Sequence, residues 1–253
     1  MPPFLSVELF AIGVVAGGLG ALLGVGGGVI LVPALILAAG LPFPQAVGTS
    51  LLCVVATSVA GSAVQFSRGR VDLPAAVRLQ FFAVLGAVGA GLGAPRVPHV
   101  ALYFAFAAML LVAATRIWPR RTEPTAHATE SGSKLTGPAG ALGGGAVAGL
   151  LGVGGGIVFT PLLHLVLGHD FHRAAATSVY LIGVTAASGA LVYLARGDVD
   201  VAFAAPAALG ALAGATAGAR ASHRIDARWL KRAFVVLLVY VSVRMVLEGV
   251  AGG

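Results

Sequence analysis

The amino-acid sequence predicts an all-α protein, a polytopic bundle of transmembrane helices built from two repeats. Hydrophobic residues make up 58% of the 253 residues and charged residues only 10%, whereas a soluble domain carries about a quarter charged residues. Each half contains three apolar runs of about 20 residues, the length that crosses a bilayer as a helix. The ten-residue alternation of a transmembrane strand barrel is absent.

The repeat is visible as a seven-residue segment, 22–28, which recurs with an identical sequence as 150–156. The offset of 128 residues aligns the two halves without a gap. Other residues that this offset matches are Pro33 and Pro161, Gly61 and Gly189, Arg68 and Arg196, Asp72 and Asp200, and Phe106 and Phe234. We therefore expect a first repeat over 1–118, a polar linker over 119–134 and a second repeat over 135–253.

Each half opens with an apolar region that is too long for one straight span. In the first half, pieces 4–23 and 28–40 are joined by a glycine cluster, and residues 135–168 repeat the arrangement. As a helix, the later piece would be about 20 Å long, too short to cross a bilayer alone. We expect either a helical hairpin, or a spanning helix followed by a re-entrant helix with an unwound glycine junction.

The remaining apolar runs predict one membrane span each. They cover about 46–66, 74–94 and 98–118 in the first half, and about 174–195, 201–219 and 229–249 in the second.

The positions of the basic residues predict the orientation. The chain has 16 Lys and Arg against 9 Asp and Glu, a net charge of +7, and they lie in loops between apolar runs, which indicates membrane orientation rather than binding to nucleic acid. If each glycine-rich region crosses and returns, 13 basic residues fall on one side and only Arg96, Arg196 and Arg244 on the other. A single crossing gives an uninformative division of 9 to 7. The count predicts inverted repeats, a cytoplasmic linker and both termini outside.

The polar residues of the chain argue against catalysis and against a mid-membrane carboxylate. None of the nine acidic residues lies at the centre of a predicted span, so a cation pump of that type is not expected. No catalytic or nucleotide-binding motif is present, and we expect no enzyme activity and no cofactor. His164, His169 and His172 surround Asp170, but the first half has no counterpart. We therefore expect an interfacial loop there and no metal site.

The glycine cluster offers main-chain groups in place of charged side chains. Closely spaced glycines disfavour a continuous helix, and the freed N–H groups need partners inside a membrane. A helix that starts after the cluster directs its positive N-terminal end at the junction, which favours an anion. The simpler alternative is that these glycines only let helices pack closely. The predicted substrate-binding glycines are Gly24, Gly26, Gly27 and Gly28, with Gly152, Gly154, Gly155 and Gly156.

Hydroxyl groups near the next helix extend this hypothesis. Thr49, Ser50, Thr177 and Ser178 occupy matched positions, where they would donate to the oxygens of an anion or bond back to a carbonyl one turn earlier.

Four further residues are weaker candidates for a substrate pathway. Gln65 and Tyr193 are matched polar residues in apolar helices, and helix contacts explain them equally well. Arg68 and Arg196 end matched helices. They would serve as interfacial anchors paired with a neighbouring acid, or as a funnel that concentrates anions.

The combination of motifs resembles the sulfite exporter TauE/SafE family of membrane permeases. The resemblance rests on the paired Gly-x-Gly-Gly-Gly segments with a downstream proline, the Ala-x-x-Thr-Ser turns and the Arg-Gly-x-Val-Asp ends, and it covers both halves. It implies transport of sulfite, sulfoacetate or related small anions across the bacterial inner membrane. Two departures, Arg70 against Asp198 and the histidine-containing loop of the second half, make the two ends of the pathway unequal.

Two alternatives to an anion transporter stay open at this point. One is a passive channel for small solutes, and the other is a structural membrane subunit in which the glycines serve packing. The expected partners are the lipid bilayer and a small anion, with homo-oligomer formation left open.

Overall fold

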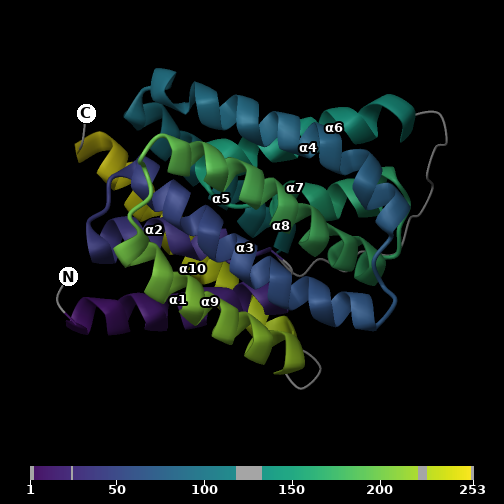
Figure 1. Ribbon diagram of the computed structural model, residues 1–253, viewed down its shortest axis with the longest axis horizontal. Coiled ribbons are helices and arrows are strands. Elements are labelled where there is room, and N and C mark those ends of the chain that lie inside the picture. The colour runs from purple at the N-terminus through teal and green to yellow at the C-terminus, as the bar shows by residue number, and fades with distance from the viewer. Residues whose placement is uncertain (1–2, 24, 118–132, 222–226, 252–253) are drawn as a thin grey trace. The chain divides into compact units, whose positions relative to one another are not determined.

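The structure is a computed structural model that describes residues 3–23, 25–117, 133–221 and 227–251 (Figure 1). Every regular element within these ranges is a helix, so the prediction of an all-helical protein is confirmed. The predicted linker, 119–134, lies almost wholly outside the described residues.

The helices of the second half follow those of the first in the same order. The first half contains α1 (Pro3–Leu23), α2 (Gly28–Ala39), α3 (Phe43–Ser67), α4 (Leu73–Gly93), a 3-10 turn η1 (Ala94–Arg96) and α5 (His99–Ile117). The second contains α6 (Ser133–Leu151), α7 (Gly156–Pro161), a π-helical turn η2 (Leu162–Val166), α8 (Phe171–Ala195), α9 (Val201–Ala221) and α10 (Ala227–Ala251). Both ends of α8 and of α9 lie 128 residues after the ends of α3 and of α4.

Length and composition make five of the described helices suitable for crossing a membrane. They are Phe4–Leu22, Phe43–Ser67, Leu73–Arg96, His172–Ala195 and Val201–Arg220. Large apolar side chains on these helices are exposed, such as Phe4, Phe81 and Leu191, each at least 64% exposed. Such a surface fits lipid, because soluble monomers rarely expose large contiguous apolar patches. In α10, side chains are described only from Phe234.

The chain forms two compact units, and each contains helices from both predicted repeats. The first comprises Met1–Leu92 and Ala126–Arg220, and the second Gly93–Thr125 and Ala221–Gly253. In the second unit α5 packs on α10, and the Ser242 hydroxyl donates to the Ala107 carbonyl at 3.1 Å.

The first unit is organised around the antiparallel pair α3 and α8, which Figure 1 shows side by side. A Cβ atom added at Gly48, near the start of α3, would lie 3.0 Å from Cβ of Tyr193, near the end of α8. One added at Gly61, near the end of α3, would lie 2.9 Å from Cγ1 of Val179, near the start of α8. The matched helices α3 and α8 therefore run in opposite directions.

Glycines bring the outer helices of this unit into main-chain contact. A Cβ atom at Gly17 of α1 would overlap the carbonyl of Ala211 in α9, and one at Gly145 of α6 would overlap the carbonyl of Ala83 in α4. These two contacts are equivalent under the 128-residue offset. Small residues at a helix interface allow this close approach in membranes. Each repeat therefore packs its first helix on the fourth helix of the other.

The interior of the described structure is neutral. The buried polar side chains are all hydroxyls: Thr49, Ser50, Thr57, Ser58, Thr177, Ser178, Thr185 and Ser242. No Asp, Glu, Lys or Arg among the described side chains is buried. A fixed charge in a membrane interior is expensive, and this fold places none there.

Candidate functional site

The glycine clusters interrupt both helices, as the sequence predicted. The main chain has positive φ angles at Gly26 (82°), Gly27 (81°), Gly154 (75°) and Gly155 (80°), which side-chain-bearing residues rarely adopt. Gly27 and Gly155 cap the N-termini of α2 and α7. The matched conformations show that the glycines create an unwound junction in addition to allowing close packing. Gly24 lies outside the described residues.

The two junctions meet each other at the middle of α3 and α8. A Cβ atom at Gly28 would lie 2.5 Å from the Gly152 carbonyl oxygen, and one at Gly156 would lie 3.1 Å from that of Val25. Val54 and Ile182, the matched residues halfway along α3 and α8, contact both junctions. A Cβ atom added at Gly154 would lie 2.7 Å from Val54 Cγ1, and one added at Gly26 would lie 3.1 Å from Ile182 Cγ2. The junctions and these two side chains form the candidate site.

At each junction a hydroxyl group donates to one carbonyl oxygen, whereas several main-chain N–H groups have no acceptor within the described structure. Thr57 Oγ1 donates to the Gly26 carbonyl and Ser50 Oγ to the Gly152 carbonyl, each at 2.9 Å. In the described part of the chain, the main-chain N–H groups of Gly26, Gly27, Gly154 and Gly155 donate to no acceptor, although all four residues are buried. A buried, unpaired N–H group costs free energy, so these positions favour a ligand that accepts hydrogen bonds.

The electrostatics of the site favour a negative charge. The N-terminal end of the 12-residue helix α2 points at the junction, and a helix N-terminus carries a partial positive charge. No buried carboxylate among the described residues opposes it.

The Thr-Ser pairs lie on α3 and α8, close to the start of each helix, and are fully buried. Ser50 is bonded to the junction, while Thr177 Oγ1 accepts from the main-chain N–H of Asp72 at 3.0 Å. Thr49 Oγ1 and Ser178 Oγ have no hydrogen-bond partner in the described structure. The matched pairs are therefore not used in the same way.

The pathway candidates also differ between the halves. Tyr193 is buried and donates from its hydroxyl to the Gly149 carbonyl at 2.9 Å, whereas Gln65 is half-buried with an unpaired Oε1. Arg196 lies over the Tyr193 ring, bonds the Gly91 carbonyl and pairs with Asp198 at 2.8 Å. The expected neighbouring acid was Asp200, so that pairing was wrong. Arg68 is exposed and has no ion pair within the described structure.

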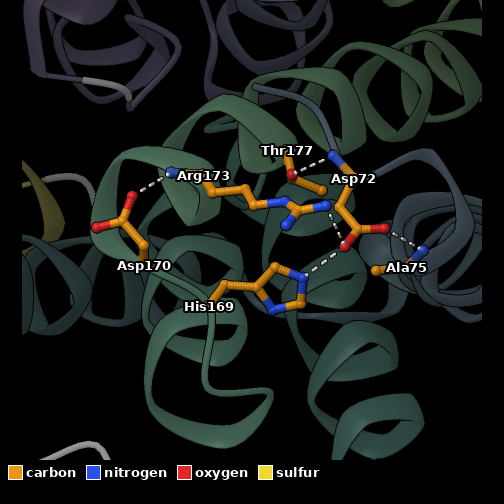
Figure 2. Close-up of polar contacts among 6 residues, drawn as sticks. All are labelled: Asp72, Ala75, His169, Asp170, Arg173 and Thr177. Carbon is orange, nitrogen blue, oxygen red and sulfur yellow. Dashed lines mark hydrogen bonds and ion pairs between the residues drawn. The ribbon is translucent and has the colours of Figure 1, made fainter. Parts of the chain in front are cut away.

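The histidine loop contacts a residue that the sequence analysis did not connect with it (Figure 2). His169 Nε2 lies 2.9 Å from Asp72 Oδ2, and Arg173 Nη2 lies 3.3 Å from the same oxygen. Asp170 instead caps α8 by accepting from the Arg173 main-chain N–H at 3.3 Å. His169 therefore contacts Asp72 of the first half. Among the described residues, no group of three His, Cys, Asp or Glu side chains is suited to hold a metal ion.

The carboxyl of Asp72 favours its ionised form. The Ala75 N–H donates to Oδ1 at 3.1 Å, and this bond, with smaller contributions from His169 and Arg173, lowers the pKa of Asp72 against the opposing effect of burial. A lowered pKa stabilises the folded protein above the ordinary carboxyl range, and that contribution is lost as the pH falls through the folded-state value.

Sequence reasoning missed three contributors to the candidate site. Val54, Ile182 and Thr57 were treated as parts of apolar spans. The 128-residue offset aligns Val54 with Ile182 and Thr57 with Thr185, and matched positions on the face of Ser50 would have been the signal for them.

Comparisons with known proteins identify a family and two relatives of this chain. A family model described as "Sulfite exporter TauE/SafE" matches residues 9–245. A probable membrane transporter protein, YunE, of Bacillus subtilis (strain 168) is 25% identical over 275 residues, covering 96% of this chain and 98% of that protein. A probable membrane transporter protein of Xylella fastidiosa (strain 9a5c) is 28% identical over 234 residues, covering 89% and 88%. No solved structure matches the chain significantly. Because the family model matches all but the ends of the chain, the chain belongs to the sulfite exporter TauE/SafE family of membrane transporters.

Proposed function

We propose that the protein carries small anions, with sulfite, sulfoacetate or related organosulfur anions as the expected substrates, and binds them at the two glycine junctions in mid-membrane. The observation that carries this proposal is the set of four buried N–H groups without acceptors, at Gly26, Gly27, Gly154 and Gly155. An oxyanion supplies several acceptor oxygens to such donors. The hydroxyls of Ser50 and Thr57 donate to the carbonyls of Gly152 and Gly26, so these two acceptors are already satisfied.

The absence of a buried counter-charge among the described residues suits release as well as binding. Main-chain donors alone hold an anion less tightly than a fixed guanidinium would, because charge-assisted hydrogen bonds are roughly twice as strong as neutral ones. Modest affinity allows the anion to leave on the far side.

The position of the site along α3 and α8 also supports the proposal. Inverted-repeat transporters place substrate between the repeats near the bilayer midplane, at helices that are broken there. Val54 and Ile182 are near the midpoints of α3 and α8, and both contact the junctions. At 12 residues, α2 spans about 18 Å, so we propose a re-entrant helix rather than a full crossing.

The proposal is tested by flux of the purified protein in proteoliposomes. Sulfite, sulfate, thiosulfate, sulfoacetate and simple carboxylates would be screened singly and in competition, with charge movement recorded. We expect saturable flux of at least one organosulfur anion or sulfite, inhibited by the others. Equal flux of neutral solutes without anion competition would indicate a passive channel. No flux of any solute by folded protein would indicate a structural subunit.

We further propose that the repeats are inverted across the bacterial inner membrane, with a cytoplasmic linker and both termini outside. The antiparallel packing of α3 on α8 supports this, because matched helices of inverted repeats run in opposite directions. A reporter active only in the periplasm, fused after Gly253, is expected to be active, and a fusion within 119–134 is expected to be inactive. The reverse result, or the same activity in both fusions, would contradict the inverted arrangement.

A further inference from the structure

Three side chains tie the two halves together at one end of the first unit. Asp72 lies in the loop between α3 and α4. Its Oδ2 atom lies 2.9 Å from His169 Nε2 and 3.3 Å from Arg173 Nη2, both from the second half. The Asp72 main-chain N–H is bonded to Thr177 of α8. Figure 2 shows His169 and Arg173 reaching the same carboxylate oxygen.

The opposite end has no equivalent of this cluster. The 128-residue offset places Leu41 and Gln45 where His169 and Arg173 stand, and Asp200 where Asp72 stands. The Asp200 carboxylate accepts from the Ala202 N–H at 2.8 Å, and no ion pair joins it to another described residue. Thr49, which matches Thr177, has no partner for its hydroxyl in the described structure. The repeated fold therefore has this His-Asp-Arg cluster at one end only.

The cluster adjoins Ser178, the counterpart of a residue that is bonded to the candidate site. Thr177, which bonds Asp72, precedes Ser178, whose hydroxyl is buried and unpaired within the described structure. Ser178 matches Ser50, and the Ser50 hydroxyl reaches the Gly152 junction. Separation of Asp72 from the first turns of α8 would open the structure beside Ser178.

We propose that Asp72, His169 and Arg173 form a closed gate at this end. The contact between His169 and Asp72 is partly buried, with side chains 13% and 19% exposed. The lowered pKa of Asp72 favours its ionised form, and a hydrogen bond to a carboxylate is stronger than one between neutral groups. The Arg173 side chain is 56% exposed, so solvent screens its attraction to Asp72 and it contributes less. The gate controls access for the proposed anion, but its opening does not depend on which anion binds.

The gate can be tested without any substrate by the reactivity of a single cysteine. Cys53, the one native cysteine, is buried and would be replaced by alanine. Ser178→Cys then reports on opening, through its labelling rate with a membrane-impermeant maleimide. Ser67→Cys, exposed at the same end of α3, is the reference for the reactivity of an accessible thiol. The measured quantity is the ratio of the Ser178→Cys rate to the Ser67→Cys rate at one pH.

Asp72→Asn removes the charged carboxylate that His169 and Arg173 contact, and it should raise this ratio about fivefold, the size of one modest ion pair. The matched control is Asp200→Asn, which removes the equivalent carboxylate at the other end and should behave like the parent.

Equal ratios in Asp72→Asn and Asp200→Asn would overturn the gate. If Ser178→Cys does not fold, amide hydrogen exchange of 171–182 in Asp72→Asn and Asp200→Asn at one pH replaces labelling. Faster exchange only in Asp72→Asn supports the gate, and equal exchange contradicts it. Because neither readout uses transport, a failure of the proposed anion flux is seen separately.

Discussion

Alanine in place of Gly154 is expected to reduce anion flux by about tenfold or more, which corresponds to about 1.4 kcal/mol. Its Cβ would lie 2.7 Å from Val54 Cγ1 and 2.8 Å from Ile182 Cγ2. These side chains must move, and the methyl group then occupies space beside the free N–H groups. The measurement is initial flux in proteoliposomes, normalised to the amount of folded protein.

The matched control for this variant is Gly197→Ala. Gly197 has φ 76° against 75° for Gly154, but nothing lies within 4 Å of an added Cβ. Both variants therefore carry the same left-handed strain of about 1–2 kcal/mol, and only one of them alters the junction. Flux that falls equally in both, or in neither, would show that the glycine junctions do not bind the transported anion.

Larger residues at the capping glycines would be a poorer test of the site. A Cβ at Gly27 would lie 2.8 Å from the Ala16 carbonyl oxygen, and one at Gly155 would lie 2.7 Å from that of Gly144. Main-chain atoms cannot rotate away as side chains do, so these substitutions test folding more than binding.

Gly86→Ala is expected to destabilise the protein by about 3 kcal/mol or more, at the upper end of the range for overpacking. An added Cβ would overlap the Leu142 carbonyl of α6, so α4 and α6 must separate. Thermal unfolding and size-exclusion chromatography in detergent would measure the loss.

The same helix supplies the control for this prediction. Gly89 is also in α4, and nothing lies within 4 Å of a Cβ added there. Gly89→Ala is therefore expected to leave the unfolding temperature unchanged or to raise it, because alanine favours a helix over glycine by about 1 kcal/mol. Equal unfolding temperatures for the two variants would disprove main-chain contact between α4 and α6.

Much of the fold could be predicted because hydrophobic length and the internal repeat are local properties of the sequence. The expected span 46–66 corresponds to α3 at Phe43–Ser67, and the expected break at the glycine clusters lies between α1 and α2. The change from α-helix to π-helix after Pro161 was not predictable, since the matched helix with Pro33 continues as an α-helix to Ala39.

The site was predictable only in part because its contacts are between halves. The junction glycines were identified from their clustering. The filling of the site by Val54 and Ile182, and the bond from Ser50 to Gly152, depend on how α3 packs on α8. Likewise, His169 reaches Asp72 across 97 residues of sequence. The repeat suggested Asp200, the match of Asp72, as the partner of Arg196, but the structure pairs Arg196 with Asp198.

The unlike ends of α3 and α8 bear on energetics as well as on architecture. An internally duplicated carrier with identical ends would spend equal time facing each compartment. Here one end is held by the contact of His169 and Arg173 with Asp72, and the other by the contacts of Arg196 with the Gly91 carbonyl and Asp198. We therefore expect a biased resting orientation, with different half-saturation concentrations for the same anion when it is offered from opposite faces of the bilayer.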